Sequence, residues 1–156
     1  MNISNWDSIL RGGLFHCTSI KCLRKILKSG AIEPNIGQFS DNQALSRQSR
    51  CRKLGGISLF DTTLSSDPGH FFQWLALTNL AIVLNRDAIA PALLDPSSHE
   101  TVKGIVLRGE LCCLAKIPKS QFLGYLIGHN SRTLERLDVN TPIEVIAGKL
   151  EEIGNR

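Results

Sequence analysis

The sequence lacks the features that mark a membrane-bound or secreted protein. None of its 156 residues lies in an apolar run close to the roughly 18 residues that a membrane-spanning helix needs. The longest apolar run, residues 75–84, is interrupted by Thr78 and Asn79. The first residues also lack the basic and then apolar order of a secretory signal. We therefore expect a cytoplasmic protein that makes no membrane contact.

Familiar arrangements of cysteine are also missing. The five cysteines are an odd number and include no Cys-x-x-Cys pair: Cys17, Cys22, Cys51, Cys112 and Cys113. The two adjacent ones are poorly placed to bond to each other. No paired Cys/His spacing typical of a zinc site occurs. The sequence therefore predicts five reduced thiols and no metal.

Common catalytic motifs are absent as well. There is no P-loop, no Gly-x-Gly-x-x-Gly after a strand, no His-Glu-x-x-His and no Gly-x-Ser-x-Gly. A hydrophobic content of 42% with 21% charged residues is typical of a globular chain, and the length suits one domain over residues 1–156. The net charge of +4 permits a polyanionic partner without requiring one.

The clearest predicted element is a helix that begins after Thr18-Ser19 and ends at Gly30. A hydroxyl before a helix can accept from its first N–H groups, and glycine is a common stop. The apolar side chains of this helix recur at helical spacing, at Ile20, Leu23, Ile26 and Leu27.

The remaining pattern predicts more strands than helices. Strands are expected at 14–17, 57–60, 80–84, 105–117 (one long strand or a bent pair), 122–127 and 143–147. Helices are expected at 70–78 and 131–137, with a helical turn at 88–94. A lead-in (1–12), a polar loop (31–54) and a frayed tail (149–156) complete the chain. This order is not a regular βαβ alternation, so it predicts an α+β fold with a split or curved sheet.

Two polar residues stand out in apolar surroundings. His16 ends a predicted buried strand directly before a capped helix, a place that suits an anion or a ribose. It could equally be a partly buried histidine that is bonded to a backbone carbonyl. Glu110 is a lone acid in an apolar stretch, and a buried carboxylate needs a partner or a cleft. It could instead lie on a solvated face or pair with Arg108.

Two further segments could contact a ligand. Gly55-Gly56 precedes a strand and would allow a ligand close to the backbone, although an ordinary turn would use the same residues. A basic cluster follows the polar loop and could contact phosphate or nucleic acid, or simply be solvated. Its members are Arg47, Arg50, Arg52 and Lys53.

Taken in order, three blocks resemble the ADP-ribosyltransferase superfamily. Residues 15–32 resemble its opening, in which His-x-Thr is followed by Leu-x-x-Ile-Leu-x-x-Gly-x-Ile. Residues 55–61 resemble its second core strand. Residues 109–126 resemble the block in which an acidic residue on a strand is followed by Ile-Pro and another strand. The blocks cover about half of the chain, and the most similar branch is the DarT-like DNA ADP-ribosyltransferase toxins and related phage-defence proteins.

The resemblance implies a split mixed β-sheet that holds NAD as a substrate in its cleft. Such enzymes break the nicotinamide–ribose bond and pass ADP-ribose to a nucleic acid or protein acceptor, which would suit a toxin or defence effector with a neutralising antitoxin. By position, Glu110 and His16 would be the catalytic residues, and His16 would also bind a ribose of NAD, beside Cys17 and Thr18. Gly56, Ser58, Phe60 and Arg52 are the other implied NAD contacts, with Ser58 or Phe60 beside the nicotinamide. Arg47, Arg50 and Lys53 would contact the acceptor or a phosphate.

Some family features differ in this chain. Ser58 and Phe60 stand where many members have a tyrosine, and Arg108 replaces the first acid of the arginine-modifying branch, which argues against an arginine acceptor. Cys22 lies near the place of an asparagine in DarT-like enzymes.

Three other interpretations stay open. The chain could be a binding module that recognises NAD, a derivative or nucleic acid without turnover. It could be an NAD-dependent RNA 2′-phosphotransferase, although that activity would need more histidines than the four present. It could also be a small interaction protein in which His16 and Glu110 are structural.

Overall fold

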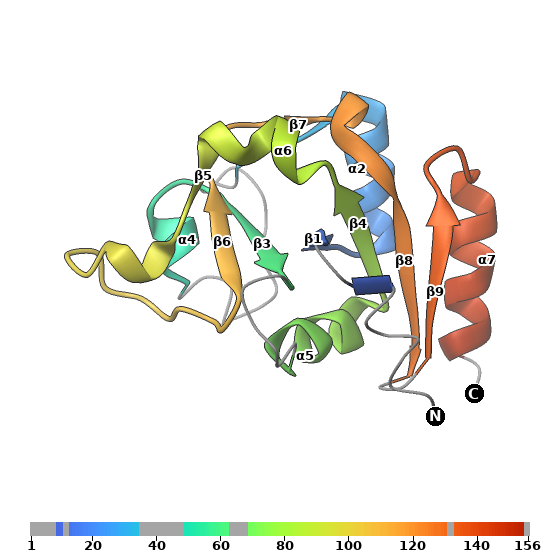
Figure 1. Ribbon diagram of the computed structural model, residues 1–156. Helices are drawn as coiled ribbons and strands as arrows, with labels where there is room; N and C mark the ends of the chain where they lie inside the picture. The colour runs from blue at the N-terminus through green and yellow to red at the C-terminus, as the bar shows by residue number, and fades with distance from the viewer. Residues whose placement is uncertain (1–8, 11–12, 35–48, 63–68, 131–132, 155–156) are drawn as a thin grey trace.

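An antiparallel sheet of seven strands organises the chain in the computed structural model, which describes residues 9–10, 13–34, 49–62, 69–130 and 133–154 (Figure 1). The strand order is β5-β6-β3-β1-β4-β8-β9. In chain order, the strands are β1 (Leu14–Cys17), β3 (Ile57–Asp61), β4 (Leu80–Leu84), β5 (Leu93–Leu94), β6 (Glu110–Cys113), β8 (Phe122–Asn130) and β9 (Thr133–Asp138). A second, two-stranded sheet pairs β2 (Ala31–Ile32) with β7 (Ile117–Pro118). The predicted α+β class is confirmed.

Helices are fewer and mostly short. They are α2 (Ile20–Ser29), α4 (Arg50–Lys53), α5 (Gly69–Thr78), α6 (Arg86–Ile89) and α7 (Ile143–Gly154). Three 3₁₀ turns, at Ala90–Ala92, Pro96–Ser98 and Lys119–Gln121, join neighbouring strands and helices. No helix in the described part of the chain is long and apolar enough to cross a membrane.

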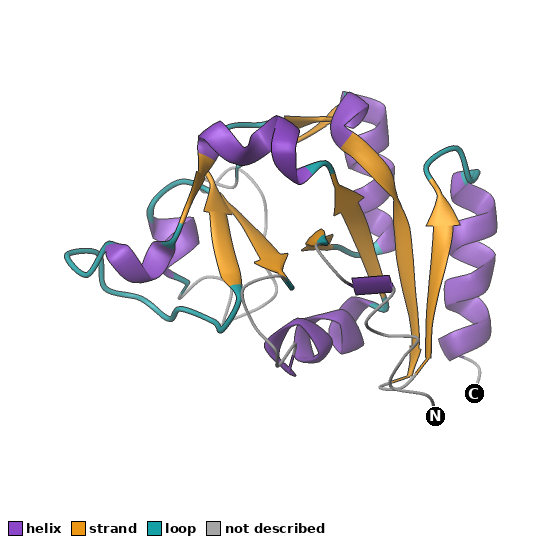
Figure 2. Ribbon diagram, viewed as in Figure 1, coloured by secondary structure: helices purple, strands orange, loops and turns teal. Residues whose placement is uncertain are grey.

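The central strand β1 pairs unequally with its two neighbours. Its ladder with β4 runs through all four residues, from Leu14↔Leu84 to Cys17↔Ala81. Its ladder with β3 has only two registered pairs, of which the last is Phe15↔Phe60. From His16 onward, β1 therefore follows β4 and separates from β3. Figure 2 shows the resulting halves, β3 with β6 on one side and β4, β8 and β9 on the other.

The β1–α2 unit forms as its sequence predicts. The Ser19 hydroxyl accepts a hydrogen bond from the Cys22 N–H at 3.2 Å, which satisfies one of the free donors of the first turn. Gly30 ends the helix with φ of 85°, in the left-handed region where a side chain would be strained. Because the cap lies two residues beyond the strand, the chain turns into α2 directly after His16 and Cys17.

Each face of the sheet is covered by different helices. One face packs Leu14, Ile82 and Leu111 against apolar side chains of α2 and α7. The other face packs Phe15 and Phe60 against α5. Strand β4 is buried at every position, as its aliphatic sequence predicts for a strand covered on both faces.

The sequence predictions after residue 100 are partly wrong. The stretch 105–117 is not one strand: only Glu110–Cys113 joins the main sheet, and Ile117 lies in the two-stranded one. The helix predicted at 131–137 is strand β9 over its described residues, and the strand predicted at 143–147 is the first half of α7. Lys149, expected to begin a frayed tail, lies inside α7 with its amine 2.6 Å from Glu135 Oε1. Ile146, fully buried, anchors this helix to the sheet.

The prediction of five reduced thiols is also wrong. Cys51 and Cys112 form a disulfide, whose Cα atoms lie 5.4 Å apart. The free cysteines are Cys17, Cys22 and Cys113. Spacing in sequence did not reveal the pair, because 61 residues separate the two cysteines and only the fold brings α4 onto β6.

Candidate functional site

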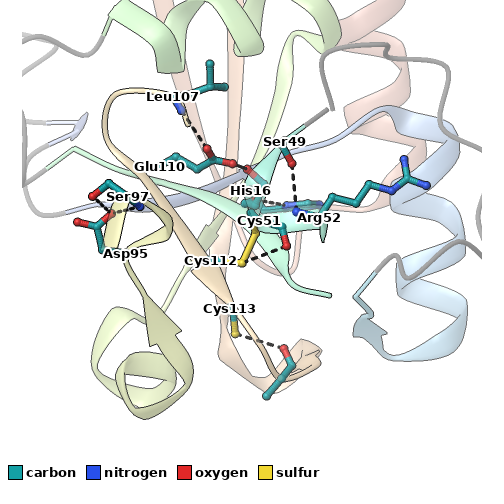
Figure 3. The surroundings of a disulfide bond; sticks show 12 residues. His16, Ser49, Cys51, Arg52, Asp95, Ser97, Leu107, Glu110, Cys112 and Cys113 are labelled. Carbon is teal, nitrogen blue, oxygen red and sulfur yellow. Dashed lines mark hydrogen bonds between the residues drawn. A yellow bond between two sulfur atoms is a disulfide. The ribbon is translucent and has the colours of Figure 1, made fainter. Parts of the chain in front are cut away.

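The candidate site lies where β1 and β3 separate. There the His16 imidazole reaches from β1 toward β3, and its Nδ1 lies 3.1 Å from the Ser58 carbonyl oxygen (Figure 3). A carbonyl can only accept, so Nδ1 carries the ring proton. The contact is the backbone-carbonyl bond that the sequence analysis kept as its structural alternative for His16.

The Nε2 atom of His16 can accept a hydrogen bond, because the ring is neutral and its proton is on Nδ1. Burial lowers the pKa of His16, and the hydrogen bond to the Ser58 carbonyl opposes this shift. The imidazole is therefore neutral near pH 7, with a lone pair on Nε2. No partner for Nε2 is found among the described residues. His16 is thus suited to accept a hydrogen bond from a hydroxyl group.

Glu110 is the second polar group, and it is almost fully buried. It opens β6 with 4% of its surface exposed. Its Oε1 accepts from the Ser58 hydroxyl at 2.6 Å, and its Oε2 accepts from the Leu107 N–H at 3.0 Å. Gly109, with φ of 76°, allows the tight turn that aims this N–H at the carboxyl. The lone acid of the sequence is therefore a buried group with two donors.

Burial raises the pKa of Glu110, while the hydrogen bonds from Ser58 and Leu107 act to lower it. A carboxyl group in this setting holds its proton to a higher pH than an ordinary glutamate does. Shifted pKa values of this kind are common at catalytic positions, although structural groups also show them.

Ser58 joins the two groups. Its carbonyl accepts from His16 and its hydroxyl donates to Glu110. It stands on β3 opposite Cys112, and Glu110 is the residue two positions earlier on β6. Strands β1, β3 and β6 are consecutive in the sheet, so residues that are far apart in sequence meet at one place.

The residues around His16 on β1 have structural surroundings. Burial strongly raises the pKa of the Cys17 thiol, so it stays protonated and is a poor nucleophile. Thr18 is buried, and its backbone N–H donates to the Leu80 carbonyl at 3.0 Å. Both residues hold the end of β1 in place.

Gly56 and Phe60, both predicted to contact NAD, make packing contacts inside the protein. A Cβ on Gly56 would overlap the Cys112 sulfur, so this glycine admits the disulfide. Phe60 is buried in an aromatic cluster, with its ring centroid 5.9 Å from that of Phe71 and 6.4 Å from that of Trp74. Of the three residues predicted at this place, Ser58 alone touches both His16 and Glu110.

The basic cluster is only partly described. Arg47 lies outside the described residues, while Arg50, Arg52 and Lys53 form α4. Arg50 donates from Nη1 to the Pro96 carbonyl at 2.9 Å, which holds this guanidinium against a neighbouring turn. Lys53 is exposed to solvent. The cations of α4 thus differ in role, and Arg50 has a structural one.

A buried ion pair that was not predicted from the sequence lies at the edge of this region. Asp61, 1% exposed at the end of β3, pairs with Arg86 at 2.7 Å. An acidic residue at the end of an apolar strand was the available signal. Among the described residues, no group of three His, Cys, Asp or Glu side chains could hold a metal ion.

Comparisons with known proteins add no family to this description. The chain matches no protein-family model, and no curated protein matches it in sequence. The geometry of His16, Ser58 and Glu110 is therefore the basis for the function proposed below.

Proposed function

We propose that this chain is an NAD-dependent ADP-ribosyltransferase that breaks the nicotinamide–ribose bond and transfers ADP-ribose to a nucleic acid or protein acceptor. One observation carries the proposal: His16 of β1 and Glu110 of β6 both bond to Ser58 at the place where the sheet separates. The family resemblance expects an imidazole and a carboxylate from these two blocks to share one dinucleotide site. Their shared neighbour supports that expectation, since His16 bonds to the Ser58 carbonyl and Glu110 to the Ser58 hydroxyl.

In this proposal, Glu110 acts on the ribose. Loss of nicotinamide leaves positive charge on the ribose ring, as in glycoside cleavage. A carboxylate in a water-poor site stabilises that charge strongly, and it can also take a proton from the acceptor. Ser58 and the Leu107 N–H fix both carboxyl oxygens, so the group needs little reorganisation as charge develops.

His16 serves binding in this proposal. Its Nδ1 proton is held by the Ser58 carbonyl, so Nε2 accepts from a ribose hydroxyl. The low pKa of His16 keeps the ring in this neutral form at physiological pH. The imidazole therefore orients the ribose whose bond is broken.

The cations of α4 supply charge for the diphosphate or the acceptor. Arg50 is bound to the Pro96 carbonyl and is assigned a structural role. By the resemblance, Arg52 would contact the pyrophosphate and Lys53, exposed to solvent, the acceptor or a phosphate. Guanidinium and ammonium groups make strong charge-assisted hydrogen bonds to phosphate.

The test is nicotinamide release from NAD by the wild-type protein and by Glu110→Gln, with water, single-stranded DNA, RNA or protein extract as acceptor. The glutamine is nearly isosteric. Its Oε1 can accept from the Leu107 N–H, and its Nε2 can donate to the Ser58 hydroxyl oxygen, which then accepts where it donated to the carboxylate. We therefore expect at least a hundredfold loss of release with a melting temperature within a few degrees. Glu151→Gln, an exposed change on α7, is the matched control. Full turnover by Glu110→Gln would remove Glu110 from the mechanism, and saturable NAD binding with no release by the wild type would indicate a binding module instead.

A further inference from the structure

The basic segment Ser49–Gly56 is fastened to the sheet by a disulfide. Cys51 lies within α4, and its partner Cys112 lies in β6 (Figure 3). Neither cysteine is exposed to solvent. This one covalent bond joins the segment that carries Arg50, Arg52 and Lys53 to the strand that begins at Glu110.

The disulfide lies on the same face of the sheet as the Ser58 and Glu110 side chains. Cys112 stands directly opposite Ser58 in the β3–β6 ladder, and Glu110 precedes Cys112 by two residues. Opposite residues of neighbouring strands share a face, as do alternate residues of one strand. Cys112, Ser58 and Glu110 therefore project to one side, and α4 is held on that side.

Without the bond, the segment would depend on hydrogen bonds and on the burial of Ser49, Cys51 and Gly56. A helix of four residues is far shorter than one that is stable by itself. Three hydrogen bonds from Arg50, to the carbonyls of Ile105, Pro96 and Ser97, tie it to the connection before β6. Gly56 packs directly on the sulfur of Cys112, where a larger residue would overlap the disulfide.

We propose that the Cys51–Cys112 disulfide is a redox clasp: oxidised, it holds the basic segment Ser49–Gly56 beside Glu110, and reduced, it releases that segment while the rest of the sheet stays folded. This proposal concerns the chain itself and does not require NAD chemistry. It assigns the pair a regulatory role, in place of the inert thiols that the sequence predicts.

The release is an ordinary thiol–disulfide exchange with a dithiol reductant. A thiolate of the reductant attacks one sulfur of the pair, and the Cys51–Cys112 bond breaks as a mixed disulfide forms. The second thiol of the reductant then displaces the cysteine. Two electrons and two protons pass to the protein, giving two cysteine thiols, and the reductant becomes a disulfide. Because both sulfurs are buried, α4 must open locally before the attack.

The experiment is hydrogen exchange with mass spectrometry on the full chain, oxidised and after treatment with dithiothreitol. We expect amide protection in residues 49–56 to fall at least tenfold on reduction, while protection in β4 and β8 is unchanged. Cys51→Ala/Cys112→Ala should show the reduced pattern without reductant. Cys22→Ala, which removes an exposed free thiol, should respond to dithiothreitol as the wild type does.

Three results would overturn the clasp. Residues 49–56 could stay equally protected after reduction, protection could fall equally in β4 and β8, or the bond could resist dithiothreitol until the whole chain unfolds. Each of these would make the disulfide a static crosslink. If the double variant does not fold, the comparison of oxidised and reduced wild-type protein still tests the proposal. No arm uses NAD, so failure here is separate from failure of the proposed transferase.

Discussion

At the scale of single residues, Ser58 determines the chemistry of its neighbours. Its carbonyl sets the tautomer of His16, and its hydroxyl holds one carboxyl oxygen of Glu110. Burial and hydrogen bonding act in opposite directions on Glu110, because burial raises the pKa and the two donors lower it. Removing one donor should therefore change the pKa in a known direction.

We predict that Ser58→Ala moves the acidic limb of nicotinamide release to higher pH. The variant loses a hydrogen bond that lowers the pKa of Glu110, so the carboxylate forms only at a higher pH. The pH profile of kcat/KM for nicotinamide release measures this shift. Ser98→Ala, at an exposed serine, is the control and should leave the profile in place. An unchanged acidic limb in Ser58→Ala would show that Glu110 does not set it.

The same raised pKa has a consequence for stability. The folded state holds the Glu110 proton to a higher pH than the unfolded chain does, so the stability it contributes is complete at acid pH. This contribution is lost as the pH rises from the unfolded value of about 4.3 through the folded pKa. Glu110→Gln does not titrate. Its melting temperature should therefore rise relative to wild type as the pH increases above about 4.3. A difference that stays constant with pH in calorimetry would contradict the burial argument.

At the scale of elements, prediction from sequence succeeded where the signal was local. Ser19 and Gly30 cap α2 as expected, and the buried run of β4 was readable from its aliphatic residues. The errors came where tertiary contacts decide. Four of the six residues of strand β9 are polar, and more and less exposed residues alternate along this edge of the sheet. Its sequence does not exclude a helix. The charged end of α7 is ordered because its apolar side packs on the sheet, which local sequence does not reveal.

We predict that Ile146→Ala destabilises the protein by about 2–4 kcal/mol, because a fully buried isoleucine loses its packing and leaves a cavity. Denaturant unfolding of Ile146→Ala and of Val145→Ala measures the difference. Val145 is 46% exposed on the same helix, so its truncation should cost under about 1 kcal/mol. Equal effects of the two changes would mean that α7 is not docked as described.

For the candidate site, the residues could be predicted from the sequence, but the hydrogen bonds between them could not. His16 and Glu110 were found because each is a polar residue in apolar surroundings. Their bonds to Ser58 depend on β1, β3 and β6 lying side by side, a nonlocal pairing that no spacing in sequence encodes. The disulfide was not predicted from the sequence for the same reason, since Cys51 meets Cys112 only because α4 docks on β6.

At the scale of the whole molecule, the sheet is divided at its centre. Strand β1 stays paired with β4 over its full length and leaves β3 after two residue pairs, which places His16 between the two halves. One half carries Ser58, Glu110 and the disulfide-bound basic segment. The other half contains the fully buried β4 and has α7 against β8. The proposed function requires both halves to contact one NAD molecule.

Calorimetric titration with NAD tests this central claim most directly, because it needs no acceptor. We predict that Glu110→Gln binds NAD with a Kd within a few-fold of wild type, and that His16→Ala weakens binding at least tenfold through loss of the Nε2 acceptor. Glu151→Gln is the control and should match wild type. Equal Kd values for wild type and His16→Ala, or no binding by wild type at millimolar NAD, would contradict the claim that His16 and Glu110 form one dinucleotide site.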